Sequence, residues 1–155
     1  MSANKGKTFE KIIYDGFNEL PNVSIDRIPD QTMRYKDRAN VSDFIMFCLP
    51  FQHYIECKTV HGNRLPFANI TQFDALLEKS KIRGVKAGIM CWWVDKDITR
   101  WLPIESLNTM RQIGCKSIAF NDPLKNSINI SGRKKRVYFD YDLREFINAI
   151  GRQYE

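Results

Sequence analysis

Two acidic residues and a lysine at strand-like spacing are the strongest chemical signal in this sequence. Asp43 lies near the start of the apolar run 41–47, and Glu56 and Lys58 lie within the next apolar run. Strand side chains alternate between faces, so Glu56 and Lys58 share a face, and a turn at 49–51 brings Asp43 opposite them. Carboxylate oxygens are the ligands that Mg²⁺ selects, and a lysine beside them can orient a water or stabilise charge on a phosphate. The set therefore predicts metal-assisted phosphodiester chemistry, with a nuclease as the first hypothesis.

The placement of these residues strengthens the prediction, because strand interiors avoid charged side chains unless they are paired or functional. The alternative is an ordinary Glu–Lys pair on the solvent side of a sheet. Glu10, at the N-terminal end of the first expected helix, could reach the rim of the sheet, although an acid there also complements the helix dipole. Gln72, early on the second expected helix, could hold a water or a phosphate, or be a plain exposed glutamine.

A nucleotide cofactor is excluded. Gly6-Lys7-Thr8 resembles the end of a phosphate-binding P-loop, but the position that should hold the first glycine of that motif is Met1, and no strand precedes it.

Basic residues predict an anionic partner, with nucleic acid the first choice. The net charge is +6 and the pI is about 9.2. Tyr35 lies among basic residues and could stack on a base. The basic residues form two groups, at 34–38 and at 133–136, and either group could instead be a solvated loop. The residues expected to contact nucleic acid are Lys7, Arg34, Lys36, Arg38, Arg64, Arg133, Lys134, Lys135 and Arg136.

The length of 155 residues fits one domain, expected to span 1–155, and 43% hydrophobic content is ordinary for a globular chain. The four cysteines are scattered without a C-x-x-C pair, and Cys48, Cys57 and Cys91 lie in apolar runs, which predicts buried free thiols and a reducing cytoplasm. His53 and His61 are too few and poorly spaced to complete a zinc site. No apolar stretch is long enough for a membrane span or a signal sequence.

The elements that must position these side chains follow from periodicity and turn residues. Within the strand 85–94, Trp92 and Trp93 should point to opposite faces, one into the core. Residues 31–40 are expected to be a loop, and 121–136 are polar and Asn-rich without an assigned element. The expected helices are 8–20, about 68–84, 105–113 and a segment around 141–150; the expected strands are 23–28, 41–47, 54–60, 85–94, 98–104 and 116–120. This order predicts an α/β or α+β sheet with flanking helices.

Taken in order, the motifs resemble the PD-(D/E)XK nuclease superfamily, and more narrowly the RecU-like Holliday junction resolvases of Gram-positive bacteria and their phages. Each motif is short, and their ordered combination over about residues 5–110 is far more specific than any one of them. The matching segments are Gly6-Lys7-Thr8-Phe9-Glu10, Ser42-Asp43-Phe44, Ile55-Glu56-Cys57-Lys58-Thr59, Leu65-Pro66-Phe67-Ala68-Asn69 followed by Gln72, Ala87-Gly88-Ile89 and Trp101-Leu102-Pro103-Ile104.

The resemblance implies a restriction-endonuclease-like mixed central β-sheet flanked by helices, a homodimer, dependence on Mg²⁺ or Mn²⁺, and paired nicks across a four-way DNA junction. It implies that Asp43, Glu56 and the main-chain carbonyl of Cys57 are metal ligands. Lys58 is implied to orient the attacking water or stabilise the transition state, with Glu10 and Gln72 as auxiliary catalytic-site residues.

The chain departs from the RecU pattern in two places. The protruding segment before the catalytic aspartate is short here, near 26–41, and the part after about Gly114 carries no motif of the family. Two alternatives therefore stay open: a PD-(D/E)XK nuclease acting on duplex, flap or nicked DNA, and a non-catalytic DNA-binding recombination accessory module.

Overall fold

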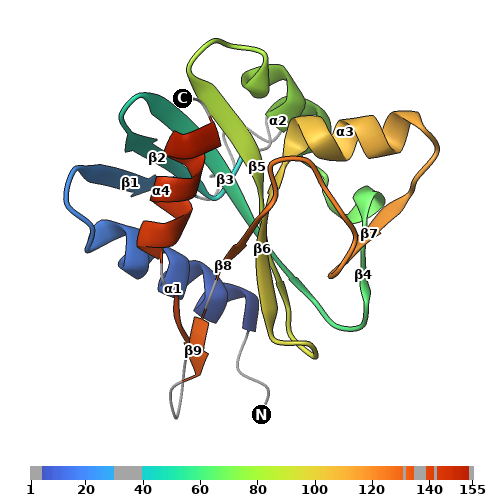
Figure 1. The fold of residues 1–155 in the computed structure, drawn as a ribbon, viewed down its shortest axis with the longest axis horizontal. Coiled ribbons are helices and arrows are strands. Elements are labelled where there is room, and N and C mark those ends of the chain that lie inside the picture. The colour runs from blue at the N-terminus through green and yellow to red at the C-terminus, as the bar shows by residue number, and fades with distance from the viewer. Residues whose placement is uncertain (1–4, 30–39, 131, 135–138, 142, 154–155) are drawn as a thin grey trace.

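The computed structural model describes the backbone of residues 5–29, 40–130, 132–134, 139–141 and 143–153, and the side chains of 5–29, 40–130 and 143–151. Figure 1 shows the arrangement of its elements. The helices are α1 (Lys5–Asn18), α2 (Phe73–Ser80), α3 (Ile104–Gln112) and α4 (Leu143–Gln153). The strands are β1 (Val23–Arg27), β2 (Phe44–Cys48), β3 (Phe51–Val60), β4 (Arg64–Pro66), β5 (Val85–Trp93), β6 (Ile98–Pro103), β7 (Ser117–Ala119), β8 (Ile128–Ile130), β9 (Gly132–Lys134) and β10 (Phe139–Tyr141).

Six strands form one sheet in the order β1-β2-β3-β5-β6-β8. β3 and β5 pair in parallel, and the other neighbours pair antiparallel. A parallel pair needs a crossover, and here it consists of β4, a 3₁₀ helix at Phe67–Asn69 and α2. The predicted α/β fold, a mixed central sheet flanked by helices, is confirmed. None of the described helices has the length and apolar character to cross a bilayer.

One face of the sheet, the α1/α4 face, is covered by the first and last helices. Phe9, Ile13 and Phe17 recur every four residues on α1 and are buried, because that spacing places them on one side of a helix. The Phe146 ring of α4 lies 5.4 Å from the Phe17 ring and 5.4 Å from the Trp101 ring of β6, centroid to centroid. Aromatic contacts therefore tie both helices to the sheet.

The opposite face, the α2/α3 face, is covered over β5 and β6. Phe73 and Leu76 of α2 and Leu107 of α3 belong to one apolar cluster with residues of β5. Trp93 is in this cluster and Trp92 is in the cluster on the α1/α4 face. The prediction that the two rings part to opposite faces is confirmed.

Several element boundaries differ from the prediction. The first helix is Lys5–Asn18 rather than 8–20, and the second begins at Phe73, after the 3₁₀ helix, and ends at Ser80. The expected strand 116–120 exists as β7 but pairs with the unpredicted β4, outside the main sheet. The Asn-rich segment contains β8, which pairs with β6. A three-residue strand is too short to show a periodic pattern, so only its pairing with a neighbouring strand identifies it.

Candidate functional site

The antiparallel register of β2 and β3 brings Asp43 to Glu56. Phe44 is opposite Ile55, so the residue before β2, Asp43, falls opposite Glu56. One Asp43 carboxylate oxygen, Oδ2, accepts a hydrogen bond from the Cys57 backbone N–H at 2.8 Å. The chain reverses at Leu49–Pro50, as the sequence predicts, and the expected proximity of the two acids is confirmed.

Glu56 is a buried acid, with 3% of its surface exposed. Its Oε2 atom is buried and has no hydrogen-bond partner. Burial raises the pKa of Glu56 well above its usual range, the hydrogen bond to Asp43 and the negative charge of Asp43 raise it further, and Lys58 acts in the opposite direction. Asp43 and Lys58 are therefore close enough to Glu56 to influence its pKa.

Lys58 lies two residues after Glu56 on β3 and so projects from the same face of the strand. It is half-buried, and its partner in the parallel register is Cys91 of β5. The structure thus brings together the three residues that the spacing singled out.

Glu10 approaches this group from the other side of the sheet. It lies on α1, which packs on the α1/α4 face, and its charge contributes to the raised pKa of Glu56. Its Oε2 atom accepts a hydrogen bond at 3.1 Å from Arg27, the last residue of β1. Glu10 therefore stands at the rim of the sheet, where the sequence predicts it. Arg27 was missed, since only the β1–β2 pairing shows that it ends beside this group.

Gln72 is the N-cap residue of α2, on the same side of the sheet as Glu56. Its Oε1 atom accepts a hydrogen bond from the Thr71 hydroxyl at 2.9 Å. Its role in the site stays a prediction.

The donor set suits a divalent cation. Carboxylate oxygens are the ligands of Mg²⁺, and the unpartnered Oε2 of Glu56 is a buried acceptor that a cation could satisfy. Within the described ranges, no group of three or more His, Cys, Asp or Glu side chains is arranged around a common metal position. Any ion would therefore be held by the Asp43 and Glu56 side chains with main-chain oxygen and water. The Cys57 thiol is buried with its pKa raised, which favours the neutral thiol over the thiolate that binds metals.

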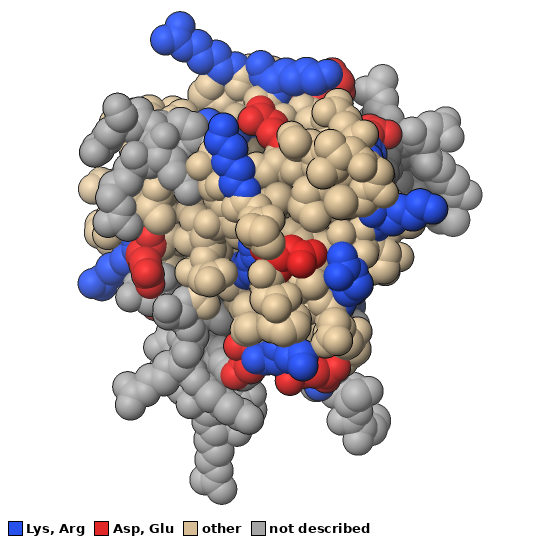
Figure 2. Space-filling model, turned by 45° about the vertical axis from the view of Figure 1, so that its right-hand side comes forward, with Lys and Arg blue, Asp and Glu red and all other residues tan. Residues whose placement is uncertain are grey.

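The predicted nucleic-acid contacts are only partly covered. Arg34, Lys36, Arg38, Lys135 and Arg136 lie outside the described residues, and for Arg133 and Lys134 of β9 only the backbone is described. Lys7 is exposed on α1. Arg64 on β4 donates to the Ser117 hydroxyl at 2.7 Å and pairs with Asp122 at 3.3 Å, so its charge is partly balanced. Figure 2 shows the Lys and Arg side chains spread over the face in view, with Asp and Glu among them.

Arg100 is a buried charge that sequence reasoning missed. It lies on β6 opposite Cys91, whose other neighbour in the sheet is Lys58. Its guanidinium donates to the carbonyl oxygens of Ala119 and Phe120 at 3.2 and 3.1 Å. Burial lowers its pKa. The sequence did carry a signal for Arg100, because it is a charged residue inside the apolar run 98–104. Strand interiors avoid charged side chains unless they are paired or functional, as argued for Glu56.

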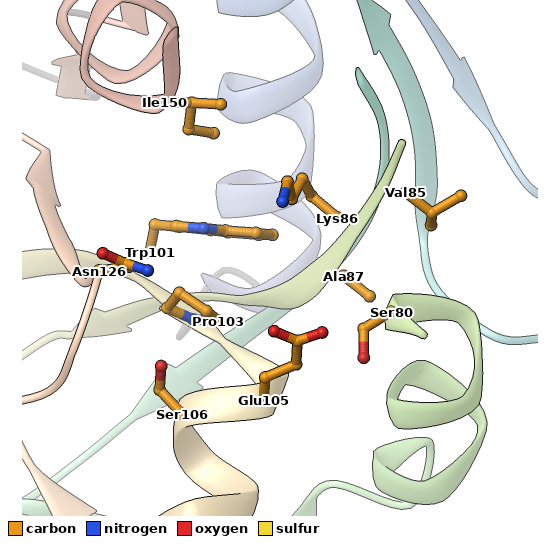
Figure 3. A pocket seen from close by; sticks show the side chains of 10 residues that line it. All are labelled: Ser80, Val85, Lys86, Ala87, Trp101, Pro103, Glu105, Ser106, Asn126 and Ile150. Carbon is orange, nitrogen blue, oxygen red and sulfur yellow. The ribbon is translucent and has the colours of Figure 1, made fainter. Parts of the chain in front are cut away.

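Two hollows lie away from the carboxylates. One, of about 30 Å³, is at the end of β5 remote from Lys58 and is lined by side chains from α2, β5, β6, α3 and α4 (Figure 3). It has room for about one water. The other, of about 320 Å³, lies between α3 and residues 123–126. Neither is lined by Asp43, Glu56 or Lys58.

Similarity to known proteins is found among solved structures, of which 13 chains match. No protein-family model matches the sequence, and no curated protein matches it. Among solved structures, the chain is similar to Hjc of the archaeal hyperthermophile Archaeoglobus fulgidus, a Holliday junction resolvase. The TM-score is 0.48 at 12% sequence identity, over 64% of this chain and 77% of the archaeal chain. At that level of similarity, the function has to be argued from the site itself.

Proposed function

We propose that this protein is a metal-dependent endodeoxyribonuclease that nicks branched DNA, with four-way junctions as its preferred substrate. The observation that carries the proposal is Glu56: a buried carboxyl with an unpartnered oxygen, opposite Asp43 and two residues from Lys58. An acid whose pKa is raised by burial and, further, by a second acid is costly to the fold, and such costs are concentrated at functional sites. The choice of four-way junctions as the substrate rests on the resemblance of the ordered motifs to junction resolvases.

The Asp43 and Glu56 carboxylates and the main-chain carbonyl of Cys57 would hold Mg²⁺, or Mn²⁺ in its place. When bound, the ion would polarise the scissile phosphodiester and lower the pKa of a bound water. The hydrogen bond from the Cys57 N–H fixes the orientation of the Asp43 carboxylate before any ion arrives.

The remaining residues act through charge and position. The Lys58 ammonium orients the attacking water or stabilises the extra negative charge on the phosphate oxygens. Glu10, held by Arg27, assists the metal site from the rim, and Gln72 holds a water or a phosphate oxygen from the α2 side. We place the protein in the cytoplasm, where its free thiols stay reduced.

Symmetric resolution of a four-way junction needs two active sites related by a two-fold axis, so the proposal includes a homodimer. Light scattering at working concentration tests this directly. A monomer would favour a nickase or another duplex, flap or nick nuclease.

The decisive experiment is cleavage of a labelled synthetic four-way junction beside linear duplex, flap and single-stranded controls, in Mg²⁺, Mn²⁺ or EDTA. Asp43→Asn is the matched variant, because it removes a ligand charge with little change of shape. We expect paired symmetric nicks that EDTA and the variant both abolish, with DNA binding nearly unchanged in the variant.

Equal cleavage of all substrates would support nuclease activity and refute the preference for four-way junctions. Tight junction binding without cleavage in either metal would support the accessory module instead. Unimpaired cleavage by Asp43→Asn would refute the metal-ligand role.

A further inference from the structure

Exposed apolar side chains gather at the β2–β3 turn. Four large apolar residues of the described chain are well exposed: Phe47 (47%), Leu49 (80%), Ile82 (54%) and Ile113 (76%). The first two lie on β2 and its turn, and the loop carrying Ile82 lies against that turn, since the Gln52 N–H donates to the Gly84 carbonyl at 2.9 Å. Three of the four therefore share one corner, with Ile113 elsewhere on α3's C-cap.

This corner is continuous with the candidate site. Alternation along the strand places Asp43, Ile45 and Phe47 on one face, the α2/α3 face. The helices of that face pack on β5 and β6 and leave Ile45 half-buried and Phe47 exposed. We call Ile45, Phe47 and Leu49 the β2 strip. It begins beside the carboxylates and ends at the turn.

The surroundings of the β2 strip are basic at its turn end. Residues 44–55 contain no acid, and residues 78–83, which include the loop against the turn, contain three basic residues and one acid. The Lys79 ammonium lies 5.5 Å from the centre of the Tyr54 ring, next to the strip on β3. The acids lie toward the other end of the strip: Asp26 of β1 is opposite Ile45, and the carboxylates of Asp43 and Glu56 are at its start. At the turn end, an apolar surface with a mainly cationic border suits a polyanion that also presents flat apolar faces.

Two occupants compete for such a surface. A second copy of the chain would bring the basic borders together under a two-fold axis, and like charges oppose that contact. DNA with exposed bases satisfies both features, since phosphates pair with lysine and arginine while bases stack on aromatic and aliphatic side chains. Paired bases inside a linear duplex are already stacked, whereas a branch point exposes base faces.

We propose that the β2 strip stacks on bases exposed at a DNA branch point and so selects branched over linear DNA. This rests on the proposed nuclease function and adds the element that recognises the substrate. Four residues of antiparallel strand from Asp43 to Phe47 span roughly 14 Å. At about 3.4 Å per nucleotide along one strand, the cut is expected within about four nucleotides of the branch.

The test is binding in EDTA, which needs no cleavage. The probe is a four-way junction with 2-aminopurine at the branch, and a linear duplex of the same length is its comparison. The strip variant is Phe47→Ser with Leu49→Ser, both exposed and therefore tolerated by the fold, and the matched control is Ile113→Ser. Stacking supplies about 1–3 kcal/mol per base, so we expect the strip variant to lose roughly tenfold in junction affinity and the 2-aminopurine signal. Duplex affinity and the control should stay unchanged.

An unchanged junction affinity and 2-aminopurine signal in the strip variant would overturn the inference, as would an equal loss on duplex and junction. So would a dimer that dissociates on mutation, or strip-dependent binding to anionic vesicles without an effect on DNA. Failure of the proposed function is distinct: it appears as cleavage that survives Asp43→Asn, or as no cleavage at all, while the EDTA binding result stands by itself.

Discussion

The α1/α4 face of the sheet is lined with apolar side chains, many of them aromatic, whereas the α2/α3 face carries Asp43, Glu56, Lys58 and Arg100 among its strands. The first face is covered by α1 and α4, and His53, whose ring contacts Phe146, is the buried polar side chain among its apolar ones. The second face leaves Phe47 of β2 exposed and buries an acid with an unpartnered oxygen.

This difference separates stability from chemistry. Apolar contacts on both faces supply the free energy of folding, and only the α2/α3 face sets buried charges, those of Glu56 and Arg100, against it. Substitutions on the two faces should therefore affect different measurements, and the following predictions run from the largest expected effect to the smallest.

Phe146→Ala on the α1/α4 face should destabilise the protein by about 3–5 kcal/mol, because it removes a fully buried ring packed on Phe17 and Trp101. Urea denaturation measures the loss. Phe47→Ala, an exposed ring of the other face, is the control and should change stability by less than about 0.5 kcal/mol. Equal effects of the two changes would remove the contrast between the faces.

Lys58→Ala should lower the cleavage rate by about 10²–10³-fold, as expected when a charge that stabilises the transition state is lost. Stability and Mg²⁺ affinity should stay close to wild type, which denaturation and isothermal titration measure. Lys116→Ala, in the exposed α3–β7 connection, is the control. Lost metal affinity in Lys58→Ala would show that the lysine organises the ligands rather than the reaction.

Glu56→Gln should stabilise the metal-free protein at pH 8 by about 1–3 kcal/mol, because the neutral amide can be buried without taking up a proton, whereas the carboxyl, whose pKa is raised by burial, cannot. The pKa of Glu56 in the folded state lies above its ordinary value of 4.5. At pH values between these two pKa values the folded protein binds one more proton than the unfolded chain, so the stability falls as the pH rises. Thermal melts in EDTA at pH 5 and 8 test the sign. Glu19→Gln, on the exposed surface after α1, should show no such difference.

His53→Leu should weaken the acid sensitivity of the fold. Burial lowers the pKa of His53 to about 4 from an ordinary value of 6.5. The unfolded chain then takes up the proton first, so stability is complete above pH 6.5 and is lost as pH falls toward 4. Between pH 7 and 5 the wild type should lose about 2 kcal/mol that the variant keeps. His61→Leu, at an exposed histidine, is the control, and a matching change there would contradict the assignment.

The candidate site could be predicted largely because its members are close in sequence. Asp43 and Glu56 are joined by one hairpin, so strand alternation and a two-residue turn fix their proximity. Arg27 and Arg100 could not be assigned, because their positions depend on which strands become neighbours. The edge strand β8 was missed for a similar reason. It has three residues, two of them buried isoleucines, and only its pairing with β6 shows that this short segment is a strand.

The sequence by itself determined the periodic elements, the sharing of one face by Glu56 and Lys58, and the parting of Trp92 and Trp93 to opposite faces, since all of these follow from local backbone geometry. Only the tertiary structure decided that Glu10 lies close enough to influence Glu56, that one Glu56 oxygen is buried without a partner, and that Phe47 of β2 stays exposed. These features depend on how helices cover a finished sheet, and burial is a property of that packing rather than of any segment of the chain.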